Sequence, residues 1–162
     1  MSKAYQLAER EVGTVEWRDG SNPKVVAYFR DAGSPVTDDA TAWCAAFVGA
    51  MLKRAGSKGT GSLLARSYLK WGRSVEIEDA RIGDLVIFQR GNSNWQGHVA
   101  FYVRRVGPNI EVVGGNQSDS VSIWRYSAAS LLGVRRDVEP IVQPIAQPMP
   151  AWLAAILAWF KK

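Results

Sequence analysis

Residues 97–115 read GHVAFYVRRVGPNIEVVGG, and this stretch decides the fold. In its first half, Val99, Phe101 and Val103 alternate with other residue types, and an alternation with a period of two predicts a β-strand with two different faces. Residues 110–113, IEVV, give a second strand-like run after a turn. We therefore predict two neighbouring antiparallel strands, with His98 opening the first and pointing with Ala100 toward the opposite face from Val99.

The sheet extends on both sides of this pair. Residues 85–88, LVIF, form a short apolar run that is typical of a buried strand, and residues 121–126 are also strand-like. Turns rich in Gly, Asn and Asp separate these runs. Helical patterns precede the strands along the chain, and this order is typical of an α+β domain with an antiparallel sheet. The domain is expected to end near Asp137.

Four helices are expected before the sheet. The expected ranges are 3–12, 22–32, from just after residue 39 or 41 to residue 55, and 63–71. The first spaces Tyr5, Leu7, Ala8 and Val12 for a buried stripe. Asn22-Pro23 starts the second with a capping side chain followed by proline, and Gly56 ends the third.

Composition narrows the class of protein. The 162 residues are 47% hydrophobic and 22% charged, as in an ordinary globular domain. The single cysteine excludes an intramolecular disulfide, and the N-terminus lacks an apolar core of signal-peptide length, so we expect synthesis and folding in the cytoplasm. The net charge of +5 suits an anionic partner or is only a solvated surface. Without a Lys/Arg run, nucleic acid is the weaker choice.

The chain has one Cys and one His, which limits the chemistry available to it. A catalytic zinc site needs about three protein ligands, so we expect no metal and no cofactor. Cys44 falls in the first turn of the third predicted helix, where unpaired N–H groups and the helix dipole favour a thiolate. His98 could serve as its base. The alternative is that Cys44 is a small buried apolar residue and His98 a structural histidine.

A third group would be needed to orient the His98 ring. Asn116 is the best candidate, because an antiparallel hairpin brings the end of the second strand beside the start of the first. Gln117 and Asp119 are weaker alternatives. On the local pattern alone, Gly114-Gly115-Asn116 is equally typical of a turn.

Five pieces of sequence together resemble the papain-like peptidoglycan hydrolases of the NlpC-type and CHAP superfamily, most closely a phage and prophage branch. They occur in the family's order within residues 3–136 and read WCAAFV (43–48), ARSYLKWG (65–72), GDLV (83–86), GHVAFY (97–102) and GGNQ (114–117). The resemblance implies a papain-like α+β fold, in which a Cys-bearing helix packs on a central antiparallel sheet that carries His. It also implies cleavage of an amide bond in the peptide part of peptidoglycan.

The resemblance assigns roles to individual residues. Cys44 would attack the carbonyl, His98 would accept the thiol proton and then protonate the leaving amine, and Asn116 would hold the ring. The Cys44 backbone N–H and one unnamed donor would meet the oxyanion. The residues expected to bind substrate are Trp43, Arg66, Ser67 and Gln117.

The C-terminal region has a different composition. Residues 138–150 contain a repeated Pro-Ile-x-Gln unit and are expected to form an extended linker after a catalytic domain at residues 1–137. Residues 151–162 are expected to form a hydrophobic helix. Its ten apolar residues would reach ~15 Å, too short to cross a bilayer core of ~30 Å. The helix could contact a membrane or outer envelope, or it could dock on the domain or on another copy.

These features predict a phage endolysin that gathers in the cytoplasm and reaches the wall after the membrane is permeabilised. Two other classes of function stay open. One is an antibacterial toxin or effector with the same chemistry, and the other is a non-enzymatic, membrane-active envelope-binding protein with an inert Cys44. The sequence does not distinguish an amidase, which separates sugar from stem, from an endopeptidase, which cuts within the stem.

Overall fold

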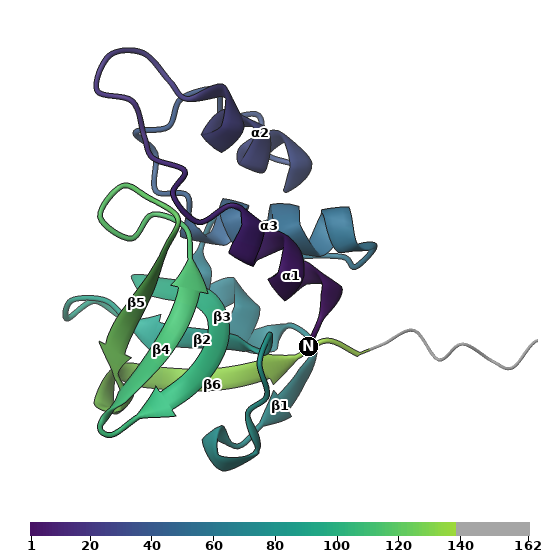
Figure 1. Cartoon of the computed structure of the whole chain (residues 1–162), viewed down its shortest axis with the longest axis vertical. Helices are drawn as coiled ribbons and strands as arrows, with labels where there is room; N and C mark the ends of the chain where they lie inside the picture. The colour runs from purple at the N-terminus through teal and green to yellow at the C-terminus, as the bar shows by residue number, and fades with distance from the viewer. Residues whose placement is uncertain (139–162) are drawn as a thin grey trace, which may run out of the picture.

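The computed structural model describes residues 1–138, in which a group of helices precedes a six-stranded antiparallel sheet (Figure 1). The helices are α1 (Lys3–Arg10), α2 (Pro23–Asp31), α3 (Cys44–Ala55) and the 3₁₀ segments η1 (Ala65–Lys70), η2 (Ile77–Asp79) and η3 (Ala128–Ser130). The strands are β1 (Arg73–Val75), β2 (Leu85–Gln89), β3 (Gly97–Val106), β4 (Asn109–Gly114), β5 (Ser122–Ser127) and β6 (Leu131–Arg136). The α+β class predicted from the sequence is confirmed. The predicted helix at 151–162 and all but the first residue of the predicted linker lie outside the described residues.

The strands are ordered β1-β6-β2-β3-β4-β5, and each neighbouring pair is antiparallel. Strands β2 to β5 follow one another in chain order, as their alternating pattern predicts. β6 instead returns to lie between β1 and β2. The sequence pattern indicates neither β1 nor β6, because three residues are too few to show a period and Gly133 interrupts the apolar positions of β6.

Helix α3 is the central helix of the fold. Its first nine residues are buried, because α1 and α2 cover one side of it and the sheet covers the other (Figure 1). Phe47 lies fully buried among Tyr28, Trp43 and Phe101, and burial of such a side chain contributes ~1.5–3 kcal/mol. Gly56 ends the helix as predicted, with a left-handed φ of 94° that favours glycine.

The other helices follow their predicted ranges with two differences. α2 begins after Asn22, whose side chain accepts a hydrogen bond from the Lys24 N–H, and it ends beside Ala32, as predicted. α1 ends at Arg10, two residues early, so the predicted burial of Val12 is wrong and its side chain is exposed. The fourth helix is the shorter 3₁₀ segment η1. None of the helices within residues 1–138 has the length and apolar character needed to cross a membrane.

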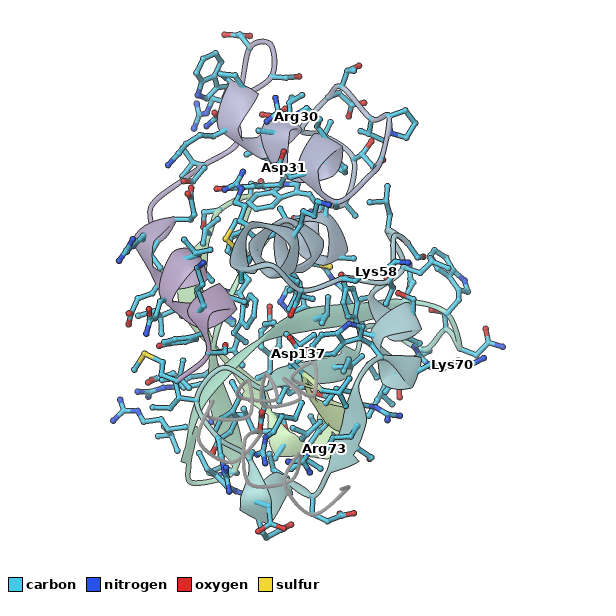
Figure 2. The ribbon with its side chains drawn as sticks, turned by 90° about the vertical axis from the view of Figure 1, so that its right-hand side faces the viewer. Arg30, Asp31, Lys58, Lys70, Arg73 and Asp137 are labelled. Carbon is cyan, nitrogen blue, oxygen red and sulfur yellow. The ribbon has the colours of Figure 1, made fainter. Side chains whose placement is uncertain are left out.

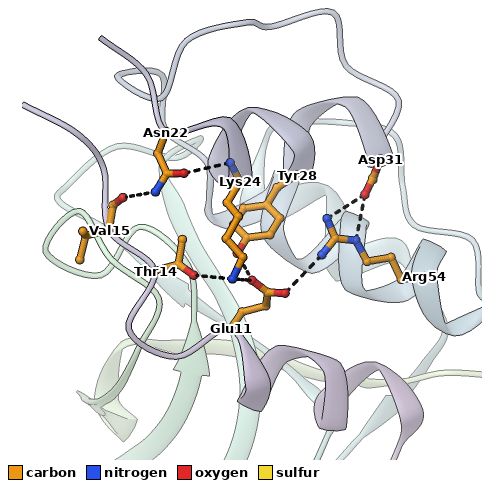
Figure 3. A network of polar contacts seen from close by, with 8 residues as sticks. All are labelled: Glu11, Thr14, Val15, Asn22, Lys24, Tyr28, Asp31 and Arg54. Atoms are coloured by element: carbon orange, nitrogen blue, oxygen red, sulfur yellow. Dashed lines mark hydrogen bonds and ion pairs between the residues drawn. The ribbon is translucent and has the colours of Figure 1, made fainter. Parts of the chain in front are cut away.

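A polar network joins the three helices on the side away from the sheet (Figure 3). Glu11, just after α1, accepts hydrogen bonds from Tyr28 at 2.7 Å and pairs with Lys24 at 2.9 Å, both on α2. Arg54 of α3 pairs with Asp31 at 2.8 Å and with Glu11 at 3.6 Å. Burial raises the pKa of Glu11, but the contacts with Lys24 and Tyr28 outweigh it and leave that pKa below its ordinary value. The network fixes the helices against one another.

The GDLV piece of the sequence has a structural role. Asp84 is buried and accepts hydrogen bonds from Arg136 Nε at 2.8 Å and Arg136 Nη2 at 2.7 Å, while its carboxylate also accepts the Arg81 backbone N–H at 2.8 Å. Such bidentate pairs are strong and directional. The pair joins the start of β2 to the end of β6, and so closes the described domain at the residues just before 138.

Candidate active site

Cys44 is the first residue of α3. Trp43 before it is not helical (φ −120°, ψ 14°), so the chain enters the helix at the cysteine. The first N–H groups of a helix have no partner within it. Here the backbone N–H groups of Cys44 and Ala45 act to lower the pKa of the thiol, the effect expected of a helix start, but burial outweighs them and the predicted preference for a thiolate does not follow.

The Cys44 thiol is 6% exposed, and burial raises its pKa. The N–H groups of Val99 and Ala45, and the positive charge of Arg90, act in the opposite direction without reversing the shift. The contact with Val99 also shows how the helix meets the sheet, because Val99 directly follows His98 on β3. Cys44 is therefore a neutral thiol at rest, next to donors that would stabilise a thiolate.

His98 lies near the start of β3 and is 2% exposed. Its ring packs on Tyr126 of β5, with the ring centroids 4.9 Å apart. Burial lowers the pKa of His98 to about 4, with a smaller effect of the same sign from Arg90. The imidazole is thus neutral at pH 7 and has one nitrogen free to accept a proton.

His98 shares its face of β3 with Ala100, opposite Val99, as predicted. Val99 and Phe101 pack in the core cluster that contains α3, whereas Ala100 and Tyr102 belong to a second cluster on the other side of the sheet. The face of β3 that carries His98 is therefore not the face that α3 covers. Cys44 instead meets β3 at the Val99 N–H, one residue along the strand from His98. Within residues 1–138 the hydrogen bond of the His98 ring is to Gln117, not to the sulfur.

Gln117 orients the His98 ring. Its Oε1 lies 3.1 Å from His98 Nε2, and its Nε2 donates to the Ser122 carbonyl at 2.7 Å and to the Ser122 hydroxyl at 3.1 Å. A carbonyl oxygen can only accept, so the amide NH₂ must face Ser122 and Oε1 must face the ring. His98 Nε2 therefore carries the hydrogen. Nδ1 is left as the proton acceptor, as a general base requires.

The loop around Gln117 is shaped to place this side chain. Asn116, Ser118 and Asp119 have positive φ values of 56°, 50° and 57°, which are uncommon outside glycine. A Cβ on Gly114 would lie 2.8 Å from Gln117 Oε1, and one on Gly115 would lie 2.5 Å from the Trp43 ring. The two glycines are thus needed for close packing. Backbone hydrogen bonds from residues 13–16 to residues 119–121 hold the loop from outside.

The structure corrects the predicted third residue. Continuing the pairing of Phe101 with Val113 would place residue 116 opposite His98, as the hairpin argument expects. The ladder ends at Gly114, however, and the left-handed Asn116 turns the chain so that the next side chain reaches the ring. Asn116 is partly exposed and lines a cavity. Gln117, predicted to bind substrate and also given as a weaker alternative for the third group, is 3% exposed and is the residue that holds His98.

Three other residues predicted to bind substrate have different contacts in the structure. Trp43 is fully buried, and its Nε1 donates to Glu16, so the prediction that it binds substrate is wrong. Arg66 donates to the carbonyls of Gln96 at 2.7 Å and Ser93 at 2.9 Å, which fixes the loop between β2 and β3. Ser67 is hydrogen-bonded to Thr60. None of the three lines the cavity beside His98.

That cavity, of about 230 Å³, opens beside His98 and Gln117. Sequence reasoning missed its other walls, which are Gln89, Arg90, Ser118, Trp124 and Tyr126. The pairing of Phe88 with His98 brings the end of β2 beside the start of β3, and the Tyr126 ring packs on both Phe88 and His98, with ring centroids 4.9 Å apart in each pair. The alternation in β5 predicts that Trp124 and Tyr126 share a face of the sheet. It does not predict that this face lies next to His98. Within residues 1–138, His, Cys, Asp and Glu side chains do not gather in a group of three or more that could hold a metal.

Replacing Gln117 with Leu should lower kcat/KM by about 10²-fold, because the ring loses the acceptor that fixes its tautomer. The matched control is Asn116→Gly, which keeps the left-handed backbone and should change kcat/KM by less than about 3-fold. Steady-state kinetics with a soluble stem-peptide substrate would measure both. The reverse order of effects would restore Asn116 as the orienting residue.

The low pKa of His98 should make folding depend on pH. An unfolded His titrates near 6.5 and the folded one near 4, so the unfolded chain binds the extra proton between these values. Stability is complete above pH 6.5 and falls as pH drops toward 4, by ~2 kcal/mol between pH 7 and 5. Urea unfolding at both pH values would measure the loss. Because the chain has one His, His98→Gln should remove this part of the dependence, and an unchanged slope would contradict the assignment.

Comparisons with known proteins agree with this geometry. The model of the CHAP domain family matches residues 36–116, half of the chain, and this span includes Cys44 and His98. A comparison with curated proteins gave no significant match.

Several solved structures share the fold. They include an NLP/P60-family protein similar to lipoprotein from Staphylococcus aureus subsp. aureus Mu50, with a TM-score of 0.55 and 18% identity over 85% of this chain and 41% of that one. The P60 domain of an antigen from M. avium subspecies paratuberculosis has a TM-score of 0.54 and 14% identity over 85% and 94%. The peptidoglycan hydrolase RipB from Mycobacterium tuberculosis has a TM-score of 0.54 and 18% identity over 85% and 64%. The chain therefore spans about two fifths of the staphylococcal protein.

Proposed function

Because the chain belongs to the CHAP domain family, we propose that it is a cysteine peptidoglycan hydrolase in which Cys44, His98 and Gln117 form the catalytic triad. One observation carries the proposal: the helix-start thiol of Cys44 meets the backbone N–H of Val99, the residue that follows His98 on β3, while Gln117 fixes the tautomer of His98 at the wall of an open cavity. A structural cysteine would need neither the oriented base nor the cavity. RipB, which shares the fold, is itself described as a peptidoglycan hydrolase.

The reaction begins with a neutral thiol and a neutral imidazole. Cys44 Sγ attacks the carbonyl carbon of a stem amide while His98 Nδ1 accepts the thiol proton. The backbone N–H groups at the start of α3 stabilise the negative oxygen of the tetrahedral intermediate. His98 gives the proton to the leaving nitrogen, the C–N bond breaks and a thioester remains. Water then attacks the thioester, again losing a proton to His98, and releases a carboxylic acid and the free thiol.

Digestion of purified peptidoglycan tests this reaction class. We expect new primary amines and no new reducing sugar ends, because the cut bond is an amide. Mass spectrometry of the soluble fragments would separate an amidase, which frees whole stems, from an endopeptidase, which shortens them. New reducing ends without amines would indicate a glycosidase and contradict the proposal.

We further propose that the biological role is that of a phage endolysin, made in the cytoplasm and acting on the wall after the membrane is permeabilised. Residues 151–160 are apolar and end in Lys161-Lys162, a composition that suits contact with a membrane or outer envelope. A chain that ends at Glu139 should keep its activity on purified peptidoglycan and lose activity on whole cells, by about 10-fold for an anchor of this size. Turbidity clearance measures the second activity. Equal clearance by both chains would contradict a role of the tail.

A further inference from the structure

The cavity beside His98 is small and shaped by rigid elements. At about 230 Å³ it lies below the usual range of ~300–1,000 Å³ for whole-ligand pockets, so it fits one part of a larger substrate. Trp124, with 50% of its side chain exposed, and Tyr126 form an aromatic wall on β5. Because His98 also lines the cavity, whatever enters it lies next to the base of the proposed reaction.

Arg90 gives this cavity its charge. Neither Asp nor Glu lines it, and His98 is neutral at pH 7, so Arg90 is the one charged side chain among its described lining residues. Arg90 is exposed and takes part in no ion pair within residues 1–138, in contrast to Arg54, Arg104, Arg125 and Arg136. An unpaired guanidinium at the edge of a reaction site is available to an anionic group of the substrate.

The position of Arg90 is fixed by the fold. It directly follows Gln89, the last residue of β2, whose backbone pairs with Gly97 of β3. The Gln89 side chain donates to the Gly91 carbonyl at 3.1 Å, and Arg66 fixes the far end of the same loop. The charge of Arg90 makes a lowering contribution to the pKa of His98, of Cys44 and of Tyr126, smaller in each case than the effect of burial, so the guanidinium lies near these groups. The loop therefore presents the guanidinium toward the site.

We propose that Arg90 is a specificity-determining residue that binds a carboxylate of the stem peptide in this cavity, with Trp124 and Tyr126 packing on the adjoining apolar atoms. The proposal rests on the proposed hydrolase function and adds the chemical class of the group recognised. A guanidinium matches a carboxylate with two parallel hydrogen bonds, whereas an amidated carboxyl group offers a single acceptor and no charge. The enzyme should therefore prefer stems whose acidic residue is not amidated.

Two substrates and two variants test this preference. The first substrate is a stem peptide in which every carboxylate is free. The second is the same peptide with one carboxylate amidated, and the comparison is repeated for each carboxylate of the stem in turn. The variants are Arg90→Gln and Arg73→Gln. Arg73 lies in β1, at the opposite edge of the sheet from β5 and on the face shown in Figure 2, and its replacement removes the same charge far from the cavity. The rate of Cys44 alkylation by iodoacetamide reports on the thiol itself.

For one of the amidated positions, we expect the wild-type protein and Arg73→Gln to favour the free carboxylate by about 10- to 100-fold in kcat/KM, as loss of a hydrogen bond to a charged group implies. Arg90→Gln should cleave both peptides at the rate of the amidated one, with its alkylation rate within about 2-fold of wild type. An equal loss on both peptides, or a preference that survives in Arg90→Gln, would overturn the proposal. Failure of the wild-type protein to release amines from any peptide or from peptidoglycan would instead contradict the hydrolase function.

Discussion

Replacing Cys44 with alanine should reduce amine release from peptidoglycan by at least about 10³-fold, because loss of the nucleophile removes the covalent route altogether. The fold should survive, since the change removes one sulfur atom from a site at the start of α3 and leaves its backbone contacts in place. Rates on purified peptidoglycan would be compared with the thermal midpoints of both proteins. The residual rate should equal that of protein-free controls within a small factor.

Cys44→Ser supplies the matched control for size and polarity. A hydroxyl is a much weaker nucleophile than a thiol near neutral pH. This variant should therefore be nearly as inactive as Cys44→Ala while it nearly keeps the volume of the side chain. Undiminished amine release by a folded Cys44→Ala protein would leave Cys44 as the inert buried residue that the sequence also allows.

Replacing His98 with glutamine should have an effect of similar size, about 10³-fold, because neither the attacking thiol nor the leaving amine then has a partner for its proton. The pH dependence adds a second signature. Because burial lowers the pKa of His98 to about 4, the base stays unprotonated well below pH 6.5. The wild-type kcat/KM should therefore stay level from pH 7 down to about 5 and fall only as pH approaches 4.

A pH profile of kcat/KM with a soluble stem peptide would measure this limb, with the folded fraction checked by circular dichroism at each pH. A fall of kcat/KM centred near pH 6.5 would contradict this expectation, because it would show that burial of the ring in the free enzyme does not lower the pKa of His98. An active His98→Gln variant would exclude His98 as the base.

The sequence predicted much of the fold because its patterns are local. The alternation along residues 97–103 and 110–113 and the glycine after Ala55 each determine an element without help from distant residues. β6 could not be found in this way, since its place between β1 and β2 is set by pairing with residues far away in the sequence, such as Leu85 with Arg135. The resemblance to the NlpC-type and CHAP superfamily, stated from five short pieces, is confirmed by the family match and the shared fold.

For the candidate site, the sequence predicted which residues could react more successfully than it predicted where the neighbouring side chains lie. One Cys and one His left a single pair to consider, and both lie where the helix start and the strand start place them. The exchange of Asn116 for Gln117 arises from backbone conformation, because the positive φ values of the non-glycine residues Asn116, Ser118 and Asp119 do not follow from residue type alone. Trp43 was misplaced for a similar reason: proximity to Cys44 along the chain does not show that its ring points into the core.

The most direct measurement of the central claim uses the fact that the chain has one cysteine. Iodoacetamide would be added to the intact protein in steps, with the alkylated fraction counted by mass spectrometry and amine release from peptidoglycan measured in the same samples. We expect the lost activity to equal the alkylated fraction at each step and to reach zero when Cys44 is fully modified. Full alkylation of Cys44 with activity retained would contradict its role as the nucleophile.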